Sequence, residues 1–203
     1  MKTVYMLGLC IALLLCFGGC RDKEVQLPAD FLLLPNFTAQ EGELLGQNRT
    51  QMWGSLYTLE GLPPERYLYL KSDAEDGWYL CMHKYANTPV CQFEVKRIEI
   101  TQTTGQPVVL TEEPIINRLL AAVRTNTGEK VENPTAWHPN VTVYLDVPCE
   151  LTWRCSIEQE EAGMRLLYCD EKTGQWYSHD VSDILADVEG LALPFPQFLP
   201  ESE

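Results

Sequence analysis

The sequence lacks the short motifs that usually mark a catalytic site. It has no glycine-rich phosphate-binding loop and no G-x-S-x-G elbow, and none of its 8 cysteines form a C-x-x-C pair. Such motifs position a phosphate, a serine nucleophile, or a zinc-binding or redox-active thiol pair. We therefore predict a protein that is not an enzyme and that uses no metal or cofactor.

Basic residues are also scarce. The 203 residues include 15 Lys and Arg against 29 Asp and Glu, which gives a formal net charge of −14. Nucleic acids and anionic membrane surfaces attract basic patches, so this balance argues against both as partners. The charge suits a basic protein partner, and it suits equally a surface that is acidic for solubility alone.

Long hydrophobic runs are absent except at the start of the chain. Residues 4–17 form an apolar run behind the single charge of Lys2, and small residues and Cys20 follow it. The run is shorter than the roughly 20 residues of a transmembrane helix, and its pattern is that of a secretion signal. We therefore predict a signal peptide at residues 1–19.

The end of this signal, Phe17-Gly18-Gly19-Cys20, resembles the lipobox of bacterial lipoproteins, although Phe17 replaces the usual Leu. The resemblance implies that Cys20 becomes the first mature residue and carries fatty acyl groups, such as palmitate, that insert into the bilayer. Two or three acyl chains hold a protein stably on a membrane, whereas one chain holds it marginally. Arg21 stands where Asp would favour the inner membrane, so the resemblance implies an outer-membrane protein that faces the periplasm.

An ordinary signal peptide cleaved near Gly19, in a secreted protein, is the alternative. Three Asn-x-Thr sequons, which begin at Asn36, Asn48 and Asn140, are compatible with a glycosylated secreted protein. Either signal sends the mature chain to an oxidising compartment.

Composition and breaks in the pattern divide the mature chain into four parts. We predict a lipid-anchored tether and first strand at residues 20–37, and a β-rich module with one helix at residues 38–129. An antiparallel β module at residues 130–190 and a Pro-rich tail at residues 191–203 complete the chain. The predicted fold class is mainly β, either an antiparallel β-sandwich or two small β modules, with one or two short helices.

The predicted strands are short runs in which apolar and polar residues alternate. They cover residues 31–34, 55–60, 67–70, 78–85, 90–101, 141–147, 151–157, 164–170 and 175–178.

One helix is predicted between the two modules, and a short second helix is predicted at residues 181–188. Apolar residues recur at helical spacing from Ile115 to Val123, and Thr111 is the expected N-terminal cap. The apolar stripe indicates packing against a sheet.

Structural disulfides are the expected use of cysteine in an oxidising compartment. Two hairpins, centred near Ala86 and near residues 162–163, would each place one cysteine opposite another. We predict two cross-strand bridges on this basis: Cys81 with Cys91, and Cys155 with Cys169.

Lipidation of Cys20 leaves five cysteines, so one of them has no intrachain partner. Cys149 is the remaining residue, as a buried thiol or in a bridge with Cys20 or between chains. A bridge from Cys149 to Cys155 stays open as another assignment.

Two acidic turns are the predicted contacts for a partner. Tyr and Trp residues crowd both halves of the chain, and beside acidic residues they are typical of protein-binding surfaces. A solvated turn is the alternative for both, and weak calcium binding is a further one for the first turn. The candidate contact residues are Asp73, Glu75, Asp76 and Trp78 in the first turn, and Glu158, Glu160 and Glu161 in the second.

One tripeptide contains the residue types of a hydrolase triad, Ser178-His179-Asp180. Adjacent residues cannot converge on one another as a triad requires, so we predict a strand end there.

These observations favour a non-enzymatic envelope lipoprotein. Its acyl groups anchor it in the membrane, and its acidic turns bind a protein partner. Small acidic lipoproteins of this kind are similar in class to lysozyme inhibitors and to immunity lipoproteins that neutralise secreted toxins. A basic secreted effector or hydrolase is the expected partner. A structural, assembly or adhesion lipoprotein of the outer membrane is the alternative.

Overall fold

A computed structural model describes residues 23–50, 52–73, 77–102, 105–132, 134, 139–160, 162–170, 172–186 and 188–191. The predicted signal peptide, Cys20 and most of the Pro-rich tail lie outside these residues, as do Glu75, Asp76 and Glu161. No helix in the part of the chain that the structure describes is long and apolar enough to cross a membrane.

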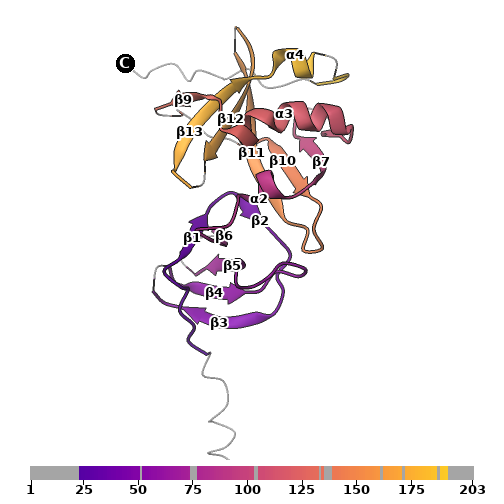
Figure 1. The fold of residues 1–203 in the computed structure, drawn as a ribbon. Helices are drawn as coiled ribbons and strands as arrows, with labels where there is room; N and C mark the ends of the chain where they lie inside the picture. Colours follow the sequence, from indigo (N-terminus) through magenta and orange to yellow (C-terminus); the bar gives the residue numbers. More distant parts are fainter. Residues whose placement is uncertain are drawn as a thin grey trace, which may run out of the picture.

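The strands form two antiparallel sheets, which confirms the mainly-β prediction (Figure 1). The first sheet has the order β1-β6-β5-β4-β3 and consists of β1 (Phe31–Leu34), β3 (Leu44–Asn48), β4 (Gly54–Tyr57), β5 (Tyr67–Ser72) and β6 (Trp78–His83). The second has the order β8-β7-β10-β11-β12-β13-β9, and β2 (Phe37–Thr38) pairs with β11. Its strands are β7 (Val95–Ile100), β8 (Val108–Leu110), β9 (Glu129–Val131), β10 (Val141–Leu145), β11 (Thr152–Glu160), β12 (Gly163–Asp170) and β13 (Gln175–Asp180).

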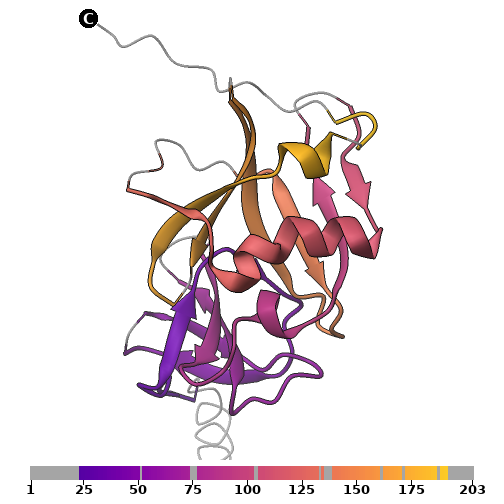
Figure 2. The same cartoon turned by 45° about the horizontal axis from the view of Figure 1, so that its top comes forward.

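The helices are α2 (Pro89–Gln92), α3 (Glu113–Thr125) and α4 (Ser182–Leu185). Helix α3 lies across one face of the second sheet (Figure 2) and buries Ile116, Leu119 and Leu120 there, so the predicted packing is confirmed. The predicted cap at Thr111 is wrong, because the chain becomes helical one residue later and Glu112 is the N-cap. Asn126 ends the helix in the left-handed conformation, with φ of 52°.

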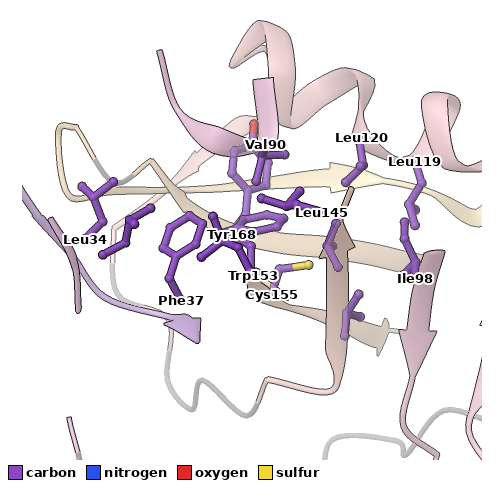
Figure 3. Close-up of a cluster of buried hydrophobic side chains, with 14 of the residues drawn as sticks. Leu34, Phe37, Val90, Ile98, Leu119, Leu120, Leu145, Trp153, Cys155 and Tyr168 are labelled. Carbon is purple, nitrogen blue, oxygen red and sulfur yellow. The ribbon is translucent and has the colours of Figure 1, made fainter. Parts of the chain in front are cut away.

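One core joins the two sheets. Leu34 and Phe37 from the first forty residues pack in the same cluster as Trp153 and Tyr168 of the second sheet (Figure 3). Helix α3 covers this cluster, and the Tyr168 hydroxyl donates a hydrogen bond of 3.1 Å to the carbonyl of Ala122. Burying each large apolar side chain contributes about 1.5–3 kcal/mol, so the sheets stabilise each other through this core.

The first sheet also surrounds a smaller core of its own. Phe31, Leu56, Leu70 and Cys81 point into it, and Leu27 covers it from the segment before β1. Consecutive β5 residues are buried because one face meets this small core and the other meets the shared one.

The segment before β1 pairs with the edge strand β3. The Val25 amide donates to the Gln47 carbonyl at 2.9 Å, and the Gln47 amide donates to the Lys23 carbonyl at 2.9 Å, around a parallel bridge from Glu24 to Gln47. The predicted tether at residues 20–37 is therefore held against the sheet from Lys23 onward.

Gly46 allows this close approach. Its φ is +147°, and a Cβ placed on it would lie 2.0 Å from the Lys23 carbonyl oxygen. The pairing of β3 with β4 also shifts register between Leu44 and Gly46, as at a β-bulge. Only glycine combines this backbone angle with room for the neighbouring segment.

The predicted strand at residues 90–101 is wrong in its first half. Pro89 occupies the first turn of α2, where its missing amide hydrogen is not needed, and the strand β7 begins only at Val95. Strand β7 pairs with β8 and β10, not with β6. The two sheets therefore divide between β6 and β7, and β7, β8 and α3 belong with the second sheet although the predicted boundary is near residue 130.

Candidate interaction surfaces

Two turns of the first sheet lie side by side at one corner of the molecule. The Asp73 amide, after β5, donates a hydrogen bond of 2.9 Å to the carbonyl of Trp53, before β4. The Trp53 side chain is 65% exposed, which is unusual for so large an apolar ring. We call Met52, Trp53 and Asp73 the Trp53 corner.

A buried asparagine holds this corner in place. The Asn48 side chain is fully buried, and its oxygen accepts hydrogen bonds of 2.9 Å from the Leu27 amide and from the Thr50 hydroxyl. Its nitrogen donates to the Met52 carbonyl at 2.6 Å. One amide therefore joins the segment before β1 to the turn that carries Trp53.

Two of the three sequons have side chains that the fold uses. Asn48 is buried, so a glycan on it is incompatible with the folded structure. The Asn140 amide both donates to the Ile157 carbonyl at 2.9 Å and accepts from the Ile157 amide at 2.8 Å, like a neighbouring strand residue. These contacts remove much of the sequence support for a glycosylated secreted protein.

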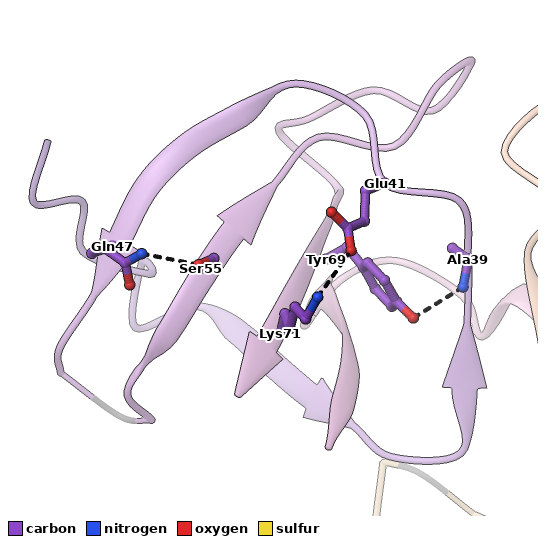
Figure 4. Close-up of polar contacts among 6 residues, drawn as sticks. All are labelled: Ala39, Glu41, Gln47, Ser55, Tyr69 and Lys71. Carbon is purple, nitrogen blue, oxygen red and sulfur yellow. Dashed lines mark hydrogen bonds and ion pairs between the residues drawn. The ribbon is translucent and has the colours of Figure 1, made fainter. Parts of the chain in front are cut away.

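Trp78, a predicted contact residue, is largely used in packing. Its ring stacks on Tyr69 with centroids 5.2 Å apart, and the Lys71 ammonium lies 4.5 Å above the ring. Lys71 also pairs with Glu41 at 3.5 Å, and the Tyr69 hydroxyl accepts a hydrogen bond of 3.0 Å from the Ala39 amide (Figure 4). Burial raises the pKa of Tyr69 to about 12. Trp53, which the sequence did not single out, is the tryptophan available at this corner.

The second predicted acidic turn lies at the end of the β11–β12 hairpin, far from β3 in Figure 1. Glu160 pairs with Gly163 and is exposed, and Glu158 pairs with Arg165 in the register. Arg165 donates to Glu129 at 2.5 Å, and this contact raises the pKa of its guanidinium. The charge of Arg165 is therefore matched by Glu129 and does not neutralise the acidic turn.

A cavity of about 370 Å³ beside the turn of the hairpin is lined by Arg165, Ser178, His179 and Asp180 among others. The Ser178 hydroxyl accepts a hydrogen bond of 2.7 Å from Arg165, while Asp180 accepts from the Ser182 amide at 2.9 Å and from its hydroxyl. The Ser182 bonds lower the pKa of Asp180. Ser178 and Asp180 thus have partners outside the tripeptide, as expected for a strand end. Among the described residues, no three His, Cys, Asp or Glu side chains are grouped to hold a metal ion.

Comparisons of the chain with protein-family models, curated proteins and solved structures find no match. The fold defines the chain as a mainly-β protein with two antiparallel sheets and short helices. Its function is therefore argued from its own surfaces and its signal sequence.

The predicted Cys155–Cys169 bridge is wrong because the hairpin register differs by one residue. Ser156 pairs with Leu167 and Ile157 with Leu166, so Cys155 falls opposite Tyr168. A shift of one residue moves a side chain to the other face of the sheet, and Cys169 therefore points away from Cys155.

The predicted Cys81–Cys91 bridge is wrong because the two residues do not face each other across a hairpin. Cys81 lies in the small core, and its partners in the strand register are Leu68 and Leu33. Cys91 lies exposed on α2. Cys81 and Cys91 both have free thiols. Cys149 is also a free and buried thiol, which was one of the alternatives that the sequence left open.

Thiol reactivity should follow this burial. Burial raises the pKa of Cys81 to about 12 and also raises the pKa of Cys149, so both stay protonated near pH 8, and the thiolate is the reactive form. We expect iodoacetamide to modify Cys91 in the native protein, and Cys81 and Cys149 only after denaturation. Light and heavy reagent added before and after denaturation, followed by peptide mapping, measures this. A peptide that joins Cys81 to Cys91 would contradict the structure.

Proposed function

We propose that the protein is a non-enzymatic lipoprotein of the bacterial envelope that is anchored by acylated Cys20 and binds a protein partner at the Trp53 corner. The partner is basic, such as a secreted effector or a hydrolase, and the protein acts on it as an inhibitor or immunity protein. The lipobox-like sequence supports an outer-membrane anchor that faces the periplasm.

The exposed Trp53 ring carries the proposal. Tryptophan is enriched among the few residues that supply most of the binding energy at protein interfaces. The turn that presents it is held by Asn48 and by the Asp73 amide, so little conformational entropy is lost when a partner orders the site.

Charge supports a basic partner. The net charge of −14 attracts a basic protein over several ångströms and raises the rate of encounter. Asp73 is exposed in the neighbouring turn and adds one carboxylate to the Trp53 corner. Trp53 then supplies most of the affinity and the acidic surface supplies the steering.

Replacement of Trp53 by Ala tests this proposal. We expect Trp53→Ala to weaken binding about 30-fold, because losing a central tryptophan costs about 2 kcal/mol. Tyr85→Ala is the matched control, because Tyr85 is 82% exposed on a different loop and should leave binding unchanged.

The measurement has two stages. Immobilised wild-type protein captures partners from envelope and secreted fractions, with a lysozyme as a defined basic probe, and biosensor titrations then compare the variants on each captured protein. Equal affinity of wild type and Trp53→Ala for every captured basic protein would overturn the proposal. A salt-insensitive association rate would overturn the steering argument.

A further inference from the structure

We infer that the β3 edge of the first sheet lies directly on the bilayer and that Leu44 contacts lipid. This inference rests on the proposed acylation of Cys20. The occupant of this edge is the membrane to which the acyl groups belong, and not a protein.

The length of the chain between anchor and fold carries the inference. Cys20 lies three residues before Lys23, and an extended chain spans at most about 3.6 Å per residue, or roughly 11 Å in all. Lys23 is already bound to β3 through its carbonyl. The folded part can therefore stand no farther than this from the acylated residue.

The thickness of the membrane interface uses much of that length. The headgroup layer occupies roughly 5–8 Å on each side of the hydrocarbon core, and the acylated cysteine lies at its inner boundary. About 3–6 Å then remain between the headgroups and Lys23, which is comparable to the spacing of about 4.8 Å between neighbouring strands. The edge of the sheet must touch the headgroups.

The direction of the chain selects the end of β3 that touches. Because residues 23–25 run parallel to β3, the chain reaches Lys23 from the Leu44 end of that strand. Leu44 is 52% exposed there, and an apolar side chain gains free energy when it enters the interface. Glu41 and Glu43 lie beside it and are exposed, so the contact depends on the acyl anchor and needs no anionic lipid.

This orientation has a consequence for the partner. The β11–β12 hairpin lies at the end of the molecule away from β3 (Figure 1). In the inferred orientation it therefore points into the periplasm. The Trp53 corner belongs to the first sheet, so a partner is bound close to the membrane surface. The protein acts on partners that arrive at the membrane and cannot extend toward distant ones.

Site-specific photocrosslinking tests the inference in the full-length protein in its native membrane. Benzoylphenylalanine replaces Leu44 in one variant and Glu160 in a control variant, and mass spectrometry measures lipid adducts after irradiation. We expect at least tenfold more adduct at position 44. A 20-residue Gly/Ser spacer inserted after Arg21 should abolish this difference, because it lengthens the tether. Equal adducts at positions 44 and 160 would overturn the inference.

The N-terminal peptide from the same membranes separates the two claims. If Cys20 is acylated and position 44 gives no excess of adduct, the docking is wrong and the anchored binding protein stands. If Cys20 is not acylated, the anchor and the docking are both wrong.

Discussion

Replacing Gly46 with Ala should lower the free energy of unfolding by about 2–3 kcal/mol. The added Cβ would lie 2.0 Å from the Lys23 carbonyl oxygen, and the φ of +147° is one that L-residues rarely adopt. The segment before β1 must then leave β3 or the strand must distort, and either change exposes Leu27 and the small core. Urea unfolding followed by tryptophan fluorescence measures the loss.

Gly174→Ala is the control for a positive φ without a close contact. Gly174 also has a positive φ, +68°, but nothing lies within 4 Å of a Cβ there. We expect a cost of about 1 kcal/mol for this variant, from the left-handed conformation. If both variants lose the same stability, the close approach of residues 23–25 to Gly46 is not what requires glycine.

Replacing Asn48 with Leu should destabilise the protein by about 2–4 kcal/mol. The side chain is fully buried and has three hydrogen-bond partners, and leucine keeps its size but leaves the Leu27 amide and the Met52 carbonyl without a partner. Each buried polar group left unsatisfied costs about 1–3 kcal/mol. Partner binding should weaken as well, because the turn that presents Trp53 loses its main support. Denaturant unfolding and biosensor affinity measure the two effects.

Gln47→Leu is the matched control on the neighbouring residue. The side-chain amide of Gln47 donates one hydrogen bond of 2.9 Å to the Ser55 hydroxyl at a half-exposed position. We expect a change within about 0.5–1 kcal/mol and unchanged binding, since water replaces the lost bond. A similar loss in Asn48→Leu and Gln47→Leu would show that the buried amide has no special role.

Sequence pattern was sufficient for the strands whose two faces differ. Strands β10 and β11 alternate apolar and polar residues because one face meets the shared core, and both were predicted close to their observed bounds. Strand β3, with the sequence LLGQN, was missed because the pattern is interrupted at Gly46, where the segment before β1 adds a second neighbour. A glycine that is required by a contact with a segment distant in sequence interrupts the local pattern by which a strand is predicted.

The candidate partner-contact residues could not be predicted from the alternation of apolar and polar residues, because this pattern does not show which aromatic side chains are exposed. Trp53 and Trp78 both stand beside the first acidic turn, yet Trp78 stacks on Tyr69 while Trp53, in the turn before β4, is 65% exposed. The predicted Cys155–Cys169 pair failed for a similar reason, since a turn shifted by one residue reverses the face of Cys169.

The mass of the mature N-terminal peptide tests the central claim most directly, because both the anchor and the membrane orientation require an acylated Cys20. Membrane and soluble fractions are separated, the protein is digested, and the first peptide is measured by mass spectrometry. The account predicts a chain that begins at Cys20, carries a diacylglyceryl group and an N-acyl group, and is found in the outer-membrane fraction. A soluble protein with an unmodified Cys20, or one that begins at another residue, would contradict it.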